Sequence, residues 1–189
     1  MSRFAGVYAQ LVDRIQLKLD STDRVPEIAT GTGLIALEIS PHVTSVTALD
    51  ISEPMIHVAR GKARAANIGN GDFQVQDACA LSFDDQQFDV CLVVNALHVM
   101  QQPDLALREI RRVLKPAGRF IAPTYCHGEN RMSRLVSGIM GLFGFKAYSR
   151  SSIRSYSDVL TANGFRITDS YLFAGTPPLA CLTAEKRSL

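Results

Sequence analysis

The stretch EIATGTGLIA, residues 27–36, constrains the fold more than any other part of the sequence. It places two glycines, Gly31 and Gly33, between an apolar run that is typical of a strand and a run that is typical of a helix. A glycine-rich turn in that position lets the backbone come close to a bound nucleotide. The stretch therefore predicts an α/β fold with a nucleotide-binding turn after its first strand.

Strand-like and helical patterns alternate along the rest of the chain. Strands are expected at 24–30, 43–50, 72–78, 88–97 and 119–126, and helices over 4–19, 33–40, 52–67 and 102–115, the last one stopped by Pro116. Two final runs, 164–173 and 179–186, are joined by only five residues, which is too short for a parallel crossover and implies an antiparallel pair. We expect one three-layer α/β domain.

Composition narrows the class of protein. The 189 residues are 47% apolar, and 20 basic and 18 acidic residues give a net charge of +2, too near neutrality to imply a nucleic-acid partner. The four cysteines contain no Cys-x-x-Cys pair, so neither a metal site nor a disulfide framework is expected. We find neither a signal peptide nor an apolar run of the ~18 to 20 residues that span a bilayer, and expect a cytoplasmic protein.

Polar residues follow the expected strands where each strand ends. In parallel sheets the ligand crevice lies beyond the carboxyl ends of the strands. The candidate residues are therefore 29–33, Asp50, Asp77, 95–98 and 125–129.

Two nucleotide ligands fit the glycine turn. Read as Gly31-x-Gly33-x-x-Ala36, it matches the dinucleotide pattern of NAD(P)-dependent oxidoreductases. Glu27 argues against that reading, because a carboxylate ~6 Å from a phosphate charge costs about 3 kcal/mol at an effective dielectric of ~20. S-adenosylmethionine carries a sulfonium and an ammonium against one carboxylate, so the same acid favours it. Asp50 can accept the ribose hydroxyls of either ligand.

Asp77 gives a second indication of an adenine nucleoside. It ends the third expected strand, next to the end of the second, and its carboxylate can accept the exocyclic amine of adenine. The backbone amide of Ala78 can donate to a ring nitrogen. An isolated Asp in this position is otherwise typical of a turn.

Four blocks together resemble the class I S-adenosylmethionine-dependent methyltransferases, in the branch that acts on small molecules, quinones or lipids. They are VPEIATGTGLIALEI, VTALDISEPMIHVAR, FQVQDACALSFDDQQFDVCLVVNALHVM and DLALREIRRVLKPAGRFIAPTY, and they cover roughly residues 20–125 in order. The resemblance implies a Rossmann-like seven-stranded, mostly parallel sheet in the order 3-2-1-4-5-7-6 with an antiparallel last strand. It also implies a single methyltransferase domain over 1–189, with a leading helical cap at 1–22 and a helical lid at 126–155.

The resemblance assigns cofactor roles position by position. The resemblance implies that the methionine end of S-adenosylmethionine is held by Glu27, Ala29, Thr30, Gly31, Thr32, Gly33 and the backbone of Asn95. It implies that Asp50 binds the ribose, and that the adenine is bound by Ile51, Met55, Asp77 and Ala78. Two residues depart from the family pattern. Ala29 stands where glycine is usual, and its methyl narrows the turn. Pro26 lies in the first strand, so either that strand begins at Glu27 or one ladder hydrogen bond is missing.

Methyl transfer from a sulfonium is an in-line displacement, and it requires a general base only when the acceptor must lose a proton. His98 and His127 are the candidate catalytic or substrate contacts, with structural hydrogen bonding as the alternative. Tyr8 either closes over the methionine end or belongs to the apolar face of the leading helix. The apolar segment 129–150 is either a helix packed on the sheet or a lid for a small, hydrophobic acceptor.

Two other functions remain open at this point. One is an NAD(P)-dependent oxidoreductase that uses Gly31-x-Gly33-x-x-Ala36, and the other is a non-catalytic module that binds S-adenosylmethionine. The acceptor atom cannot be read from the sequence, and a homodimer is compatible with it.

Overall fold

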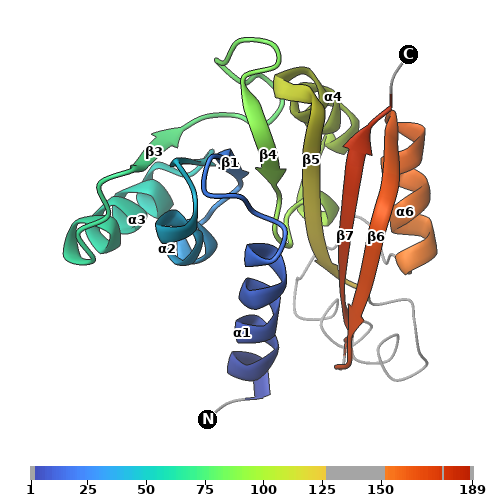
Figure 1. Ribbon diagram of the computed structural model, residues 1–189, viewed down its shortest axis with the longest axis horizontal. Helices are drawn as coiled ribbons and strands as arrows, with labels where there is room; N and C mark the ends of the chain where they lie inside the picture. Colours follow the sequence, from blue (N-terminus) through green and yellow to red (C-terminus); the bar gives the residue numbers. More distant parts are fainter. Residues whose placement is uncertain (1–2, 127–151, 176, 188–189) are drawn as a thin grey trace.

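The computed structural model of the chain describes residues 3–126, 152–175 and 177–187. Its strands form one seven-stranded sheet in the order β3-β2-β1-β4-β5-β7-β6, in which β7 is antiparallel to both of its neighbours (Figure 1). This confirms the predicted architecture. The strands are β1 (Arg24–Ile28), β2 (Ser45–Asp50), β3 (Gly71–Val75), β4 (Phe88–Leu92), β5 (Leu114–Tyr125), β6 (Phe165–Phe173) and β7 (Leu179–Lys186).

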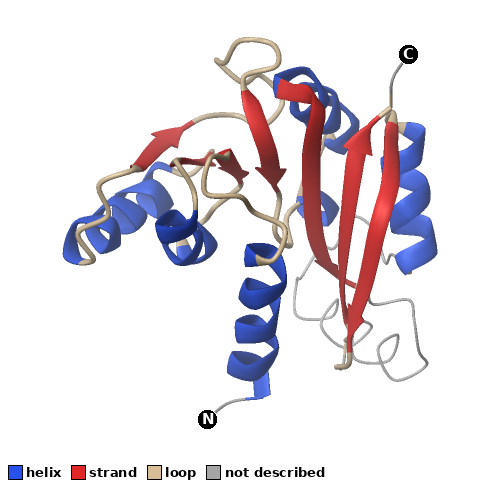
Figure 2. Cartoon of the chain, in the orientation of Figure 1, coloured by secondary structure: helices blue, strands red, loops and turns tan. Residues whose placement is uncertain are grey.

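Helices cover both faces of the sheet and complete the three layers (Figure 2). One apolar cluster joins α1, α2 and α3 to one face, and a second joins α4 and α6 to the other. Alternate residues of β4 divide between them: Val90 and Leu92 belong to the first cluster, and Cys91 to the second. The helical elements are α1 (Arg3–Gln16), α2 (Leu34–Ile39), η1 (Ser40–His42), α3 (Glu53–Ala65), η2 (Leu97–Val99), α4 (Pro103–Val113) and α6 (Ile153–Ala162). No helix in these described ranges is long and apolar enough to cross a membrane.

The junction between α4 and β5 differs from the prediction. The helix was expected to run to Lys115 and the strand to begin at Arg119, but α4 ends at Val113 and β5 begins at Leu114. A residue before proline is disfavoured in the helical conformation, so Pro116 ends the helix earlier than its own position. The register between β4 and β5 shifts from Phe88 opposite Leu114 to Val90 opposite Arg119, which accommodates the extra residues.

Pro26 lies inside β1, opposite Thr47 of β2, which rules out a strand that begins at Glu27. The amide of Arg24 donates to Asp89 Oδ2 of β4 at 3.0 Å. Amides two residues apart point to the same side of a strand, so the donor that Pro26 lacks would face β4. There β1 and β4 share the single register pair Glu27 and Leu92. The missing ladder hydrogen bond therefore falls on the more sparsely paired side of β1.

Charged side chains connect α1 to β6. Arg14 and Lys18 both pair with Asp169, Lys18 Nζ at 2.7 Å, and the Arg14 guanidinium lies 4.9 Å from the centre of the Tyr171 ring. The buried face of α1, with Leu11 and Ile15, packs into the first apolar cluster. These contacts hold α1 against β6 and the first apolar cluster.

Candidate cofactor-binding site

The glycine turn after β1 has a conformation that depends on its two glycines. Gly31 and Gly33 have φ of 56° and 75°, in the left-handed region that favours glycine. A Cβ on Gly33 would also lie 3.0 Å from the Cβ of Ala59 on α3. The Gly31 amide donates to Asp50 Oδ2 at 2.8 Å, so the end of β2 holds the turn that follows β1.

A lysine also contacts the turn. Lys62 Nζ on α3 donates to Thr32 Oγ1 at 2.9 Å and to the Thr32 carbonyl at 3.2 Å. The sequence around the turn contains no basic residue between Glu27 and Gly33, and Lys62 comes from a helix 30 residues later. The sequence did not predict this contact, because nothing in the residues around Lys62 on an amphipathic helix indicates which group its long side chain will reach.

Glu27 lies beneath the turn and is 2% exposed. Its Oε2 accepts hydrogen bonds from Thr30 Oγ1 and, at 2.9 Å, from the amide of Ala36 in α2. Within the described part of the chain no hydrogen bond reaches Oε1. Burial raises the pKa of Glu27 to about 7, although its two hydrogen bonds oppose the rise, and the charge of Asp50 adds to it. The carboxyl group is therefore poised to ionise when a cation comes close.

Tyr8 on α1 faces the same region. Its hydroxyl is buried and has no hydrogen-bond partner among the residues that the structure describes. Burial raises the pKa of Tyr8 above its usual value, and the charges of Glu27 and Glu38 raise it further. The buried Tyr8 hydroxyl has no described partner and lies near the buried carboxyl group of Glu27. This arrangement is compatible with a polar ligand that forms hydrogen bonds with both groups.

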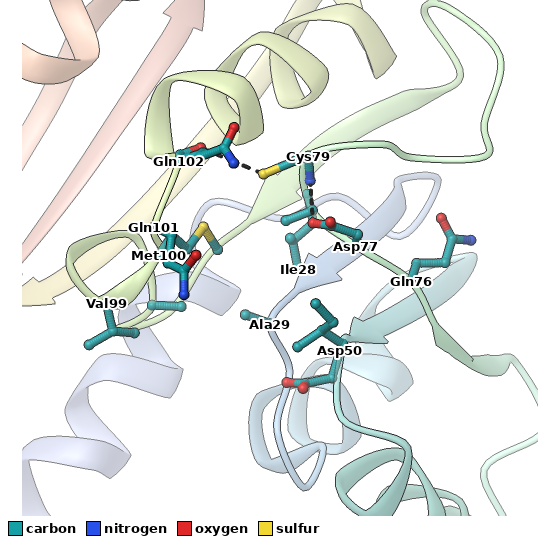
Figure 3. Close-up of a pocket in the computed structure, with 13 residues that line it drawn as sticks. Ile28, Ala29, Asp50, Gln76, Asp77, Cys79, Val99, Met100, Gln101 and Gln102 are labelled. Atoms are coloured by element: carbon teal, nitrogen blue, oxygen red, sulfur yellow. Dashed lines mark hydrogen bonds between the residues drawn. The ribbon is translucent and has the colours of Figure 1, made fainter.

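A cavity of about 480 Å³ opens beyond the carboxyl ends of the parallel strands (Figure 3). Asp50 and Asp77 contribute carboxylates that already serve their own turns: Asp50 Oδ1 accepts the Ser52 amide at 2.9 Å, and Asp77 Oδ1 accepts the Cys79 amide at 2.8 Å. Each carboxylate retains lone pairs for a ligand. The cavity is lined by Ile28, Ala29, Asp50, Ile51, Gln76, Asp77, Ala78, Cys79, Ala96, Val99, Met100, Gln101 and Gln102.

The predicted adenine contacts are only partly brought together. Ile51 and Ala78 line the cavity with the two aspartates, whereas Met55 lies in the first turn of α3 and is not part of the lining. Ile51 is 72% exposed, which leaves an apolar side chain free to cover a ligand.

Sequence reasoning missed one wall of the cavity. It consists of residues 99–102, which run from the last residue of η2 to the residue before α4, and of Cys79, whose thiol lies 3.6 Å from the Gln102 carbonyl (Figure 3). The other three cysteines are buried, as their apolar surroundings predict. The position of Val99 and Met100 soon after β4 was the one available signal, because the carboxyl ends of all the parallel strands meet at this edge.

Of the two candidate catalytic histidines, only His98 lies within the described residues. His98 lies in η2, was expected to face the crevice, and is not among the cavity-lining residues; its Nδ1 is 3.2 Å from Thr124 Oγ1 of β5. His127 lies outside the described residues, as does most of the expected lid at 126–155. Asn95 lies three residues beyond the end of β4, and its amide donates to the Pro123 carbonyl at 2.8 Å.

Comparison with known proteins identifies the family. Residues 26–122, just over half of the chain, match the family described as Methyltransferase domain. The chain belongs to this methyltransferase family. The match covers the glycine turn, both aspartates and Asn95, and it confirms the resemblance read from the four sequence blocks.

Relatives of this chain include named methyltransferases, and solved structures share its fold. An uncharacterized methyltransferase of Bacillus subtilis, YcgJ, is 30% identical over 147 residues, which cover 77% of this chain and 58% of that protein. The ubiquinone/menaquinone biosynthesis C-methyltransferase UbiE of Zymomonas mobilis is 35% identical over 100 residues, 53% of this chain and 41% of that protein. This chain thus spans about half the length of the curated relatives it matches. A SAM-dependent methyltransferase of Methanosarcina mazei has the same fold, with a TM-score of 0.78 at 21% identity, over 93% of this chain and 98% of that one.

Proposed function

We propose that the chain transfers a methyl group from S-adenosylmethionine to a small, hydrophobic acceptor. The observation that carries the proposal is the buried carboxyl group of Glu27, which adjoins the glycine turn, and whose Oε1 accepts no hydrogen bond from any described residue. An ammonium or sulfonium group is the ligand chemistry that this carboxyl group favours.

The adenosine half of the cofactor has matching groups in the cavity. Asp50 would accept the ribose hydroxyls through the lone pairs that Gly31 and Ser52 leave unused. Asp77 would accept the adenine amine, and Ile51 would cover one face of the ring.

At the methionine half, the turn residues Ala29 to Gly33 would approach the ligand through their backbone, together with the backbone of Asn95. Tyr8 would add its hydroxyl to the ammonium and carboxylate end, where it otherwise lacks a partner. Glu27, ionised by the approaching positive charge, would hold the same end.

An NAD(P)-dependent oxidoreductase is the alternative that these groups disfavour. A pyrophosphate on the turn would approach Glu27 and Asp50 together. Lys62 offers limited compensation, because its ammonium already donates to Thr32.

The cofactor, when bound, supplies an electrophilic methyl group that an acceptor lone pair displaces in line from sulfur. The chain's contribution is to hold the two reactants and exclude water. His98 and His127 are the proposed contacts to the acceptor, as bases where the acceptor carries a proton. The segments 1–22 and 126–155 are proposed to cap one domain of residues 1–189. Similarity to a quinone C-methyltransferase makes electron-rich rings the first acceptors to test.

Isothermal calorimetry with S-adenosylmethionine, NADH and NADPH tests the cofactor. We expect micromolar binding of S-adenosylmethionine that weakens at least tenfold in Asp50→Asn. The matched control is Asp84→Asn, an exposed acid that does not line the cavity. Binding of a nicotinamide nucleotide in place of S-adenosylmethionine would overturn the proposal.

Transfer is then assayed with methyl-labelled cofactor against demethylated quinols, phenols and amines. We expect label in an apolar product. Cofactor binding without transfer to any acceptor class would favour the non-catalytic binding module.

A further inference from the structure

Two charged side chains of α4, Glu109 and Arg112, hold the segment that connects β3 to β4. The Leu81 amide donates to Glu109 Oε2 at 2.9 Å, and Arg112 Nη2 donates to the Leu81 carbonyl at 2.9 Å. Arg112 Nη1 donates to the Phe83 carbonyl at 2.7 Å and to Asp85 Oδ1 at 2.9 Å. Both backbone groups of Leu81 are thus bound by side chains of one helix.

Glu109 and Arg112 also fix each other. Arg112 Nε and Nη2 donate to Glu109 Oε1 and Oε2, both at 2.8 Å, in the two-pronged geometry of the strongest arginine–carboxylate pairs. These bonds lower the pKa of Glu109, partial burial opposes the effect, and the Leu81 amide lowers the pKa further. The side chains of Glu109 and Arg112 are 18% and 29% exposed, so water screens this pair less than a fully exposed one. The pair is therefore a firm attachment for the segment.

The held segment carries the adenine side of the cavity. Asp77 Oδ1 accepts the Cys79 amide at 2.8 Å, and the Asp77 carbonyl accepts the Ala80 amide at 3.1 Å, so a tight turn leads from Asp77 to Leu81. Leu81 is 6% exposed and belongs to the second apolar cluster. Through this turn the Asp77 carboxylate is connected to α4.

A second stretch of the cavity lining is attached to the same helix. Residues 99–102 lead directly into α4, whose side chains Leu107 and Ile110 are fully buried in the second cluster (Figure 3). The thiol of Cys79 and the carbonyl of Gln102, 3.6 Å apart, join this stretch to the segment after β3. Both stretches of the lining therefore depend on α4 for their position.

We propose that Glu109 and Arg112 are positioning residues, which hold the Asp77 carboxylate in place to bind the amine of adenine. The inference deepens the proposed function and rests on it. Neither side chain is among the described residues that line the cavity, so the pair acts through the segment that it holds. A ligand with an adenine amine gains a charge-assisted hydrogen bond from this carboxylate. A carboxylate that moves freely must first be ordered, which costs affinity for that ligand specifically.

The test compares two ligands by calorimetry: S-adenosylmethionine, and its analogue in which hydrogen replaces the adenine amine. Arg112→Met removes the hydrogen bonds to Leu81 and Phe83 and keeps an apolar stem, and Arg112→Lys keeps the charge without the planar fork. Arg108→Met, on the exposed surface of α4, is the matched control. Circular dichroism and thermal unfolding verify that each variant is folded.

We expect the wild-type protein to prefer the ligand with the amine by about tenfold, and Arg108→Met to keep that preference. The preference should fall to about threefold or less in Arg112→Met, with an intermediate value in Arg112→Lys. A merely structural role would weaken the binding of both ligands equally and leave their ratio unchanged. An unchanged ratio in folded Arg112→Met, or a wild-type protein that binds both ligands equally, overturns the inference.

Amide hydrogen exchange, measured by NMR in the ligand-free protein, tests the attachment without any cofactor. Exchange of the Cys79 and Leu81 amides should accelerate at least about tenfold in Arg112→Met and not in Arg108→Met. Unchanged exchange of both amides overturns the inference. A wild-type protein that binds no S-adenosylmethionine refutes the proposed function, and with it the role at adenine, even where the exchange shows that the pair holds the segment.

Discussion

Ala29 and Asn95 adopt the same left-handed backbone conformation, with φ of 59° and 54°, just beyond the carboxyl ends of the adjacent strands β1 and β4. Asparagine tolerates this region, whereas alanine pays a steric cost in it. Two left-handed residues thus follow two adjacent strands, at the edge of the sheet where the methionine end is proposed to bind. Strain of this kind is concentrated at functional sites.

Replacement of Ala29 by glycine tests that cost. We expect Ala29→Gly to raise the free energy of unfolding by about 1 kcal/mol, because glycine adopts a φ of 59° without the clash of a Cβ. The measurement is urea denaturation, in which the dependence of the free energy of unfolding on urea concentration should be the same in both proteins. Ala65→Gly, on the exposed end of α3, is the control and should be neutral or destabilising. A loss of stability in Ala29→Gly would mean that the Ala29 side chain contributes more through packing than it costs in strain.

Glu27 predicts a pH dependence of stability in the ligand-free protein. Its pKa rises from 4.5 in the unfolded chain to about 7 in the folded one, so between these values the folded state holds a proton that the unfolded state has released. Stability therefore falls as pH rises through that window, by about 3 kcal/mol from this group. Glu27→Gln mimics the neutral acid and should flatten this part of the profile. The measurement is the urea midpoint of both proteins at pH values from 4.5 to 8. If stability depended on pH equally steeply in the wild-type protein and in Glu27→Gln, the pKa assigned to Glu27 would be contradicted.

The same carboxyl group predicts the pH dependence of binding. A cationic ligand requires ionised Glu27, so the affinity for S-adenosylmethionine should rise with pH up to about 7, by at most tenfold per pH unit, and then level off. Calorimetry in buffers of different ionisation enthalpy should also detect proton release on binding. An affinity that rises as the pH falls would instead indicate an anionic group on the turn, as with NADH.

Tyr8→Phe separates two roles of the leading helix. The buried hydroxyl has no partner among the described residues, so its removal should leave the ligand-free protein equally stable or more stable by about 1 kcal/mol. If the hydroxyl contacts the ligand, the affinity for S-adenosylmethionine should fall by about tenfold. Thermal unfolding with and without ligand measures both effects. An unchanged affinity would assign Tyr8 to the apolar face of α1 alone.

Much of the fold could be predicted because its signals are local. The glycine turn, the continuous apolar run of β4 and the short link between β6 and β7 each specify one element and its neighbours. The start of β5 was misplaced, since the effect of Pro116 extends to the residues before it. The wall formed by Met100 and Gln102 and the link from Lys62 to Thr32 depend on side chains that meet only after the sheet has assembled. Such contacts have no periodicity in the sequence.

Lys62 allows one further prediction, about the rigidity of the glycine turn. Its ammonium joins α3 to Thr32, and Lys62→Met keeps the apolar stem while it removes both hydrogen bonds. We expect the affinity for S-adenosylmethionine to fall about fivefold, since the turn then has more conformations to lose on binding. Arg64→Met, on the exposed surface of the same helix, is the matched control. Thr32→Val removes only the hydroxyl bond and should have a smaller effect, and the double variant should be little worse than Lys62→Met alone, because the bond that Thr32→Val breaks is already lost in it. Additive losses would show that Lys62 acts through its charge on the ligand and not through Thr32.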